Sequence, residues 1–292
     1  MKIKISATLD TGKERDNNED ALTYCPDLTT SQWQEAESMP AYIPIGEYGA
    51  VTVVADGMGG ANAGEVASAI AINTVKEIFV PDRIKDIVND EEQIHTLLHD
   101  VVKTADERIV NKMNTDPETA GMGTTIVICW IVKDKAHIAW CGDSRCYVYH
   151  PAHGLKALSK DHSLVQELVD NGEITHEEAF SHPDSNIITR GLGDFDTKAV
   201  PDIVVHNISH NEMLLLCSDG LVGYCQESEI EALLANSYQD VDLCSQQLLK
   251  MALDAGGYDN ISIIAASLID DDQEMPSAPS LLEKIKHFFG IS

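Results

Sequence analysis

Apolar and polar residues follow two different periods along the chain, and each period predicts a different kind of element. Alternation of Ile3, Ile5 and Ala7 with polar residues predicts a half-buried strand at the start of the chain. The unbroken apolar run from Ala50 to Ala55 is rich in β-branched residues and predicts a strand buried on both faces. Apolar residues spaced i, i+3, i+4 over 91–113 predict an amphipathic helix lying on the core.

The order of the remaining elements predicts the fold class. Further strands are predicted at 125–132, 136–140, 146–150, 213–217 and 260–269, and further helices at 63–79, 229–235 and 241–255. Strands therefore precede two helices, many strands follow, and two more helices come before the last strand. This order lacks the regular strand–helix alternation of a parallel sheet. It predicts an α+β fold in which a central antiparallel β-sandwich is flanked by pairs of α-helices.

The length of 292 residues suits one large sheet-based domain, which we expect to cover 1–270. Residues 26–49 are rich in Pro, Ser, Thr and Glu and predict a loop insertion between two strands. The polar stretch over about 163–200 predicts a mobile, flap-like segment above the core. Residues 271–292 begin as an acidic, Pro- and Ser-containing linker and continue into a short amphipathic helix at 281–289.

Composition narrows the range of partners and compartments. A net charge of −28 would repel nucleic acid and anionic lipid and suits divalent cations, although most of these carboxylates serve a solvated surface. The seven cysteines form no CxxC pair, which predicts small buried side chains in a reducing compartment. The start of the chain lacks the apolar core of a signal peptide, and the longest fully apolar run, 126–132, is too short for a membrane span. These features predict a cytoplasmic protein.

Aspartate recurs where predicted strands begin or end. Asp56, Asp143 and Asp219 follow apolar runs, and Asp259 precedes the last one. Any one of them fits an ordinary strand followed by a turn, but four together indicate one shared acidic site at the edge of the sheets. An oxygen-only set of ligands selects hard cations. The adjacent Glu19 and Asp20 either join this site or belong to an exposed charged loop.

A second metal hypothesis concerns His95 and His99, which are spaced i, i+4 on the predicted helix. Such a pair can clamp a metal ion. The local sequence offers no third ligand, so a polar helix face is the favoured interpretation.

Seven short motifs together resemble one protein family. They are Arg15-x-x-x-Glu19-Asp20, Asp56-Gly57-x-Gly59-Gly60, Gly123-Thr124-Thr125, Gly142-Asp143-Ser144-Arg145, Asp161-His162, Ser218-Asp219-Gly220 and Asp259-Asn260. In this order they resemble the metal-dependent serine/threonine protein phosphatases of the PPM or type 2C family, and the bacterial branch in particular. The resemblance implies two Mn²⁺ or Mg²⁺ ions, with a possible third, in a cleft at the end of the sandwich. It further implies hydrolysis of phosphoserine and phosphothreonine by in-line attack of a metal-bridging water or hydroxide.

The resemblance also implies a role for each site residue. Asp56 would bridge two metal ions, with Glu19 and the Gly57 carbonyl on one side and Asp219 and Asp259 on the other. Asp20 would hold a metal-bound water, and Arg15 would bind the phosphate group. Asp143 together with Asp219 would form a third metal site. Supporting roles are implied for Asn260, His162 and Ser218. Phosphorylated proteins would be the substrates, opposing a Ser/Thr kinase.

Two positions depart from the family pattern. Met58 stands where many relatives carry a histidine proposed as general acid, and Gly223 stands where some carry a further acidic ligand. A catalytically weak or inactive binding module of the same fold is the alternative function. The complete set of two-metal ligands favours the enzyme. A calcium-binding protein is disfavoured because no EF-hand spacing occurs.

Overall fold

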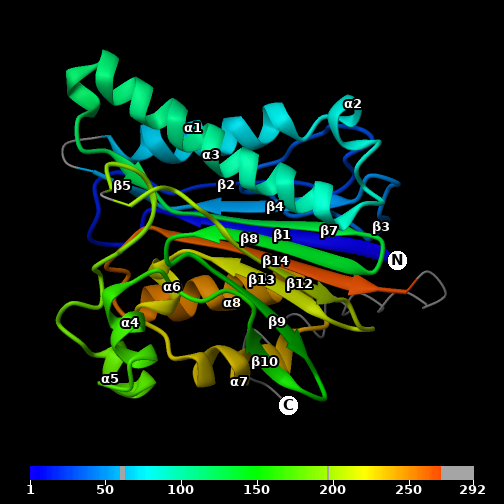
Figure 1. Cartoon of the computed structure of the whole chain (residues 1–292). Helices are drawn as coiled ribbons and strands as arrows, with labels where there is room; N and C mark the ends of the chain where they lie inside the picture. The colour runs from blue at the N-terminus through cyan, green and yellow to red at the C-terminus, as the bar shows by residue number, and fades with distance from the viewer. Residues whose placement is uncertain (60–62, 196, 271–292) are drawn as a thin grey trace.

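The computed structural model describes residues 1–59, 63–195 and 197–270, and it confirms the predicted sandwich of antiparallel sheets between helix layers (Figure 1). One sheet has the order β10 (Gly154–Ala157), β9 (Arg145–His150), β13 (Met213–Cys217), β14 (Ile261–Ile269), β1 (Lys2–Asp10) and β3 (Ile43–Pro44). The other has the order β12 (Asp202–Asn207), β8 (Lys135–Cys141), β7 (Ile126–Val132), β4 (Ala50–Ala55) and β2 (Ala21–Cys25). A small third sheet joins β11 (Leu192–Gly193), β6 (Gly123–Thr124) and β5 (Gly57–Met58).

Helices cover the outer face of each large sheet. α1 (Gly64–Ile78) and α3 (Glu91–Thr115) pack on the sheet of β4 and β7, whereas α7 (Glu227–Ser237) and α8 (Val241–Asp254) pack on the sheet of β13 and β14 (Figure 1). The other short helices are α2 (Pro81–Ile84), η1 (Pro117–Thr119), α4 (Leu164–Asp170), α5 (His176–Phe180) and α6 (Asp219–Val222).

Three apolar layers result from this arrangement. Ile5, Val54 and Leu216 belong to the layer between the two sheets. Phe79 and Trp130 meet edge to face, with ring centroids 4.9 Å apart, in the layer beneath α1 and α3. A strand such as β4, buried on both faces, must be apolar throughout, and this explains its unbroken sequence pattern.

Several boundaries differ from the sequence predictions. The helix predicted at 63–79 is α1, which ends at Ile78, and Pro81 begins the short α2, where its missing N–H costs no hydrogen bond. The 26–49 insertion contributes β3, which pairs with β1. The strand β12 was not predicted, because its residues are only partly buried and its alternation is weak.

The 163–200 segment contains α4, α5 and β11. Thr175 and Glu178 form a capping box that starts α5, a signal that the sequence analysis overlooked. The predicted linker and helix at 271–292, and Gly60 of the glycine motif, lie outside the described residues. Within the described ranges, no helix is long and apolar enough to cross a membrane.

Candidate metal centre

Five aspartates gather at one end of the sandwich, because strand ends from both sheets meet there. Asp56 directly follows β4, and Asp219 follows β13 after one serine. Asp20 directly precedes β2, while Asp259 lies just before β14. Asp143 occupies the turn that joins β8 to β9. The predicted shared acidic site is therefore formed by the topology itself.

Asp20 is held firmly at the centre of this end. Its side chain is 6% exposed, and its Oδ2 accepts hydrogen bonds of 2.7 Å from the hydroxyls of both Ser218 and Ser262. Burial raises the pKa of Asp20 to about 7, against the lowering effect of the two serines. Asp20 is thus fixed in orientation by residues that follow β13 and begin β14.

Backbone contacts fix Asp56 from the side of β6 and β7. Its N–H donates to Oγ1 of Thr125 at 3.0 Å, and its carbonyl accepts from the N–H of Thr125 at 2.8 Å. The Thr125 hydroxyl lies 2.7 Å from that of Ser144, which follows Asp143. Burial, and then the neighbouring Asp20 and Asp219, raise the pKa of Asp56 well above its ordinary range.

Asp143 and Asp219 each carry a buried oxygen, Oδ1, that has no hydrogen-bond partner. Burial and the charge of Asp219 raise the pKa of Asp143 well above its usual value. Burial and Asp259 raise the pKa of Asp219 to about 6. Such carboxylates are costly unless a positive charge lies between them.

The loop 11–20 is tied to the start of β14 through Asn260. The amide of Asn260 donates to the carbonyls of Thr11 and Asn17 at 2.9 Å, and its Oδ1 accepts from the N–H of Glu19 at 2.7 Å. Burial and Glu65 raise the pKa of Glu19. Asn260 therefore fixes the backbone of this loop at Glu19.

Arg15 lies at the solvent edge of the centre. Its Nη2 is 2.8 Å from Oδ2 of Asp259, and the Arg15 side chain is 51% exposed while that of Asp259 is 22% exposed. A guanidinium in this position is accessible to a phosphate group.

Two glycines, Gly57 and Gly220, let the backbone segments that carry the carboxylates pack closely against one another. A Cβ on Gly57 would lie 2.3 Å from the carbonyl oxygen of Gly64 and 2.4 Å from that of Glu19. A Cβ on Gly220 would lie 1.9 Å from the carbonyl oxygen of Asn260. Each distance is far shorter than a van der Waals contact, so any side chain would separate the segments that carry the carboxylates.

His162 supports the turn that carries Asp143. Its Nδ1 accepts from the N–H of Gly142 at 3.1 Å, and its ring stacks on Trp140 with centroids 6.1 Å apart. Its Nε2 is 3.3 Å from Oδ2 of Asp202, although the two atoms do not meet in hydrogen-bond geometry. Burial and Arg190 lower the pKa of His162. These contacts give His162 a positioning role.

The donor set fits hard divalent cations. In the described part of the chain, no three histidine, cysteine or carboxylate side chains already stand around one point as metal ligands. Instead, the carboxylate of Asp56 lies close enough to those of Asp20 and Asp219 for their charges to raise its pKa. Asp143 and Asp219 each add a buried carboxylate oxygen that has no hydrogen-bond partner to balance its negative charge. A divalent cation would be held by these carboxylate oxygens and would compensate their charge.

The structure does not build a metal clamp from His95 and His99. His95 instead meets His137 of β8, with ring centroids 5.7 Å apart. No group of three candidate ligands occurs there among the residues described.

Two residues of the centre escaped the sequence analysis. Ser262 sits inside the apolar run of β14, where a lone hydroxyl was the available signal, and it binds Asp20. Ser68 of α1 donates to the carbonyl of Glu19 at 2.6 Å and so fixes the adjacent residue of the loop. Their partners are distant in sequence, and only the fold brings them together.

Comparison with known proteins identifies the class of this fold and site. The family model described as protein phosphatase 2C matches residues 43–254. The chain is 36% identical over 214 residues to the serine/threonine phosphatase stp of Listeria monocytogenes, covering 73% of this chain and 82% of that protein. It is 30% identical over 272 residues to the protein phosphatase PhpP of Streptococcus pneumoniae, covering 93% of this chain and 100% of that protein.

Solved structures agree. The catalytic domain of the serine/threonine protein phosphatase PstP, in complex with two manganese ions, superposes with a TM-score of 0.72 at 28% identity, covering 92% of this chain and 99% of that one. The chain belongs to the protein phosphatase 2C family. It is a metal-dependent protein serine/threonine phosphatase, and its substrates are phosphorylated proteins.

Proposed function

We propose that the aspartate-rich end of the sandwich is a binuclear Mn²⁺ or Mg²⁺ centre that hydrolyses phosphoserine and phosphothreonine. Asp56 would bridge the two ions, Glu19 and the Gly57 carbonyl would complete one side, and Asp219 and Asp259 the other. The observation that carries this proposal is the buried, uncompensated charge around Asp56. Bound divalent cations supply Lewis acidity that yields a water-derived nucleophile near neutral pH.

The chain's own residues orient the reactants. Asp20, fixed by two serine hydroxyls, accepts a hydrogen bond from a water placed for in-line attack on phosphorus. Arg15 leaves Asp259 and binds two phosphate oxygens with its planar fork. Asp143, together with Asp219, forms a third and weaker cation site, since Gly223 adds no carboxylate there.

The biological setting is part of the same proposal. All seven cysteines are buried and free, which supports work in the reducing cytoplasm. The net charge of −28 argues against nucleic acid as a partner. A Ser/Thr kinase would supply the substrates, because a phosphatase of this class reverses kinase action.

Chelation tests the metal centre directly. We expect EDTA to abolish cleavage of a phosphothreonine peptide and Mn²⁺ to restore it. Asp56→Asn should lose both turnover and the calorimetric signal of Mn²⁺ binding, while circular dichroism shows a folded protein. Turnover that persists after exhaustive chelation, or unchanged Mn²⁺ binding by Asp56→Asn, would refute the assignment. Wild-type Mn²⁺ binding without turnover of any phosphopeptide would instead favour a binding module.

A further inference from the structure

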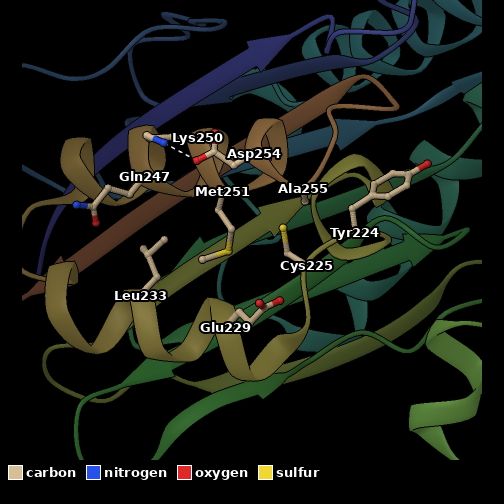
Figure 2. A pocket seen from close by; sticks show the side chains of 9 residues that line it. All are labelled: Tyr224, Cys225, Glu229, Leu233, Gln247, Lys250, Met251, Asp254 and Ala255. Atoms are coloured by element: carbon tan, nitrogen blue, oxygen red, sulfur yellow. Dashed lines mark hydrogen bonds and ion pairs between the residues drawn. The ribbon is translucent and has the colours of Figure 1, made fainter.

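A pocket of about 480 Å³ lies between α7 and α8 (Figure 2). Its apolar lining comes from both helices and from the segment between α6 and α7. These residues are Tyr224, Cys225, Leu233, Met251 and Ala255. The proposed catalytic chemistry uses none of them.

The charged side chains that line this pocket are already engaged by the protein itself, and the amide of Gln247 is a further polar group of the lining. Lys250 and Asp254 form an ion pair one helical turn apart on α8 (Figure 2). Glu229 accepts a hydrogen bond of 2.9 Å from the N–H of Gln226 and so caps the start of α7. Because these groups have partners, the surface left for a ligand is mainly apolar, which favours an apolar side chain over a charged one.

Two exposed tyrosines join the pocket to the catalytic centre. Tyr224 stands at one end of the pocket with its hydroxyl directed away from α7 and α8 (Figure 2). Its ring contacts that of Tyr258, with centroids 5.4 Å apart. Tyr258 is 54% exposed and directly precedes Asp259. Burial, and then Asp219 and Asp259, raise the pKa of Tyr224, so its hydroxyl lies within electrostatic reach of both proposed metal ligands.

The backbone under this tyrosine pair fixes the position of Tyr258. Gly256 adopts φ +136°, and a Cβ there would lie 2.1 Å from Cε2 of the Tyr258 ring. The ring therefore rests on a position that only glycine leaves open. An exposed aromatic ring held in this way offers a preorganised surface to a partner at low entropic cost.

We propose that the α7/α8 pocket is a substrate subsite of this phosphatase. It takes an apolar side chain, such as leucine, from the segment that flanks the phosphorylated residue, and that segment crosses Tyr258 and Tyr224 on its way from the metal centre. Continuity with the catalytic centre is what selects a substrate segment as the occupant. The inference rests on the proposed function, because the phosphorylated residue must be held at Arg15 and the metal centre.

A leucine scan of phosphothreonine peptides tests this subsite. A single leucine is placed in turn at each position on either side of phosphothreonine in an alanine background, and kcat/KM is measured with Mn²⁺. We expect one position to raise kcat/KM about tenfold, the discrimination that an apolar pocket provides. Met251→Glu should abolish this preference. Met113→Glu, which changes a partly buried methionine on α3 of the opposite helix layer, is the matched control and should retain it.

The ratio of peptide cleavage to nitrophenyl phosphate cleavage separates the subsite from the catalytic centre, because nitrophenyl phosphate has no flanking residues. Should Met251→Glu disturb folding, Tyr224→Ala truncates a partly exposed ring and is expected to lower the leucine preference in the same direction. Wild-type protein with no preferred leucine position, or a preference that survives both substitutions, overturns the inference. Absence of metal-dependent cleavage of both substrates would refute the proposed function instead.

The chain's own segment 281–289 is the competing occupant, because its sequence predicts an amphipathic helix with Leu282, Ile285 and Phe288 on the apolar face. A full-length Leu282→Glu, Phe288→Glu variant distinguishes the two. If the leucine preference is weak in the wild type and emerges only in this variant, the pocket is filled by that segment, and the substrate subsite is overturned. Equal preference in both proteins supports the subsite.

Discussion

Replacing Asp20 by asparagine should stabilise the metal-free protein near neutral pH while damaging the enzyme. Burial raises the pKa of Asp20 from 3.8 to about 7. A carboxyl with a raised pKa binds its proton more tightly in the folded state than in the unfolded state. The metal-free protein therefore loses stability as the pH rises from about 4 through 7, where the unfolded chain is already ionised. Asparagine cannot ionise, and its Oδ1 can still accept from Ser218 and Ser262.

The size of the effect follows from this pKa. From pH 5 to the folded pKa, about two pH units, Asp20 holds a proton in the folded state and not in the unfolded state. The free energy of unfolding then falls by about 1.4 kcal/mol for each pH unit. Wild type should thus lose about 3 kcal/mol between pH 5 and pH 7.5 that the variant keeps. For a domain of this size, that difference corresponds to about 6–12 °C in Tm.

A second buried group, His137, changes stability with pH in the opposite direction, so its contribution must be removed from the comparison. Burial and His95 lower the pKa of His137 to about 4. Its unfolded form binds a proton first as the pH falls, so His137 costs stability below about pH 6.5. The raw wild-type curve therefore combines the contributions of Asp20 and His137 with those of Asp56, Asp143 and Asp219, whose pKa values are also raised. The difference in Tm between wild type and Asp20→Asn, measured in EDTA at pH 5 and at pH 7.5, removes the His137 contribution because both proteins carry it.

The expected outcome is a variant whose Tm advantage over wild type is larger at pH 7.5 than at pH 5. Saturating Mn²⁺ should then stabilise wild type more than the variant. An advantage that is independent of pH, or larger at pH 5, would show that Asp20 is ionised in the folded protein at both values. In that case, ionisation of Asp20 does not destabilise the folded protein in this pH range.

Three further predictions concern single residues of the centre. Arg15→Ala should raise KM for phosphopeptides about tenfold or more through loss of charge-assisted hydrogen bonds, and steady-state kinetics showing an unchanged KM would exclude phosphate binding by Arg15. Gly57→Ala should weaken Mn²⁺ binding in calorimetry, because its Cβ would force apart the backbones of Glu19 and Gly64; unaltered affinity would contradict this. Asp143→Ala should slow phosphopeptide cleavage more than nitrophenyl phosphate cleavage, since only the alkoxide needs a proton to leave; equal losses of kcat would place Asp143 in ground-state binding.

Much of the fold was accessible from the sequence because its signals are local. The run at 50–55 and the helical stripe at 91–113 each report burial through their own residues, and both elements appear where they were predicted. Elements with weak local signals were not predicted, because the sequence reports only local burial. The residues of β12 are mostly only partly buried, so tertiary pairing with β8, rather than local pattern, decides their conformation.

The centre was predictable in its carboxylates but not in what holds them. Asp56 and Asp219 stand out because a charged residue follows an apolar run. Ser262 has no such signal, since its bond to Asp20 spans 242 positions in the chain. The contact of Arg15 with Asp259 was also beyond the sequence, where the motif indicated a phosphate ligand. Side-chain partners across the fold depend on topology, which periodicity does not report.

The acidic cluster places opposing demands on the residues at this end of the sandwich. Asp20 and Asp143 are each only 6% exposed, and burial together with neighbouring carboxylates raises both their pKa values. Repulsion between these carboxylates opposes the arrangement at neutral pH, and the hydroxyls of Ser218 and Ser262 offset it only at Asp20. Thr125 and Asn260 hold the backbone around them through hydrogen bonds of 2.7–3.0 Å, so the fold maintains an arrangement that its charges oppose. Cation binding relieves that opposition, and for this reason metal occupancy, stability and turnover should rise together.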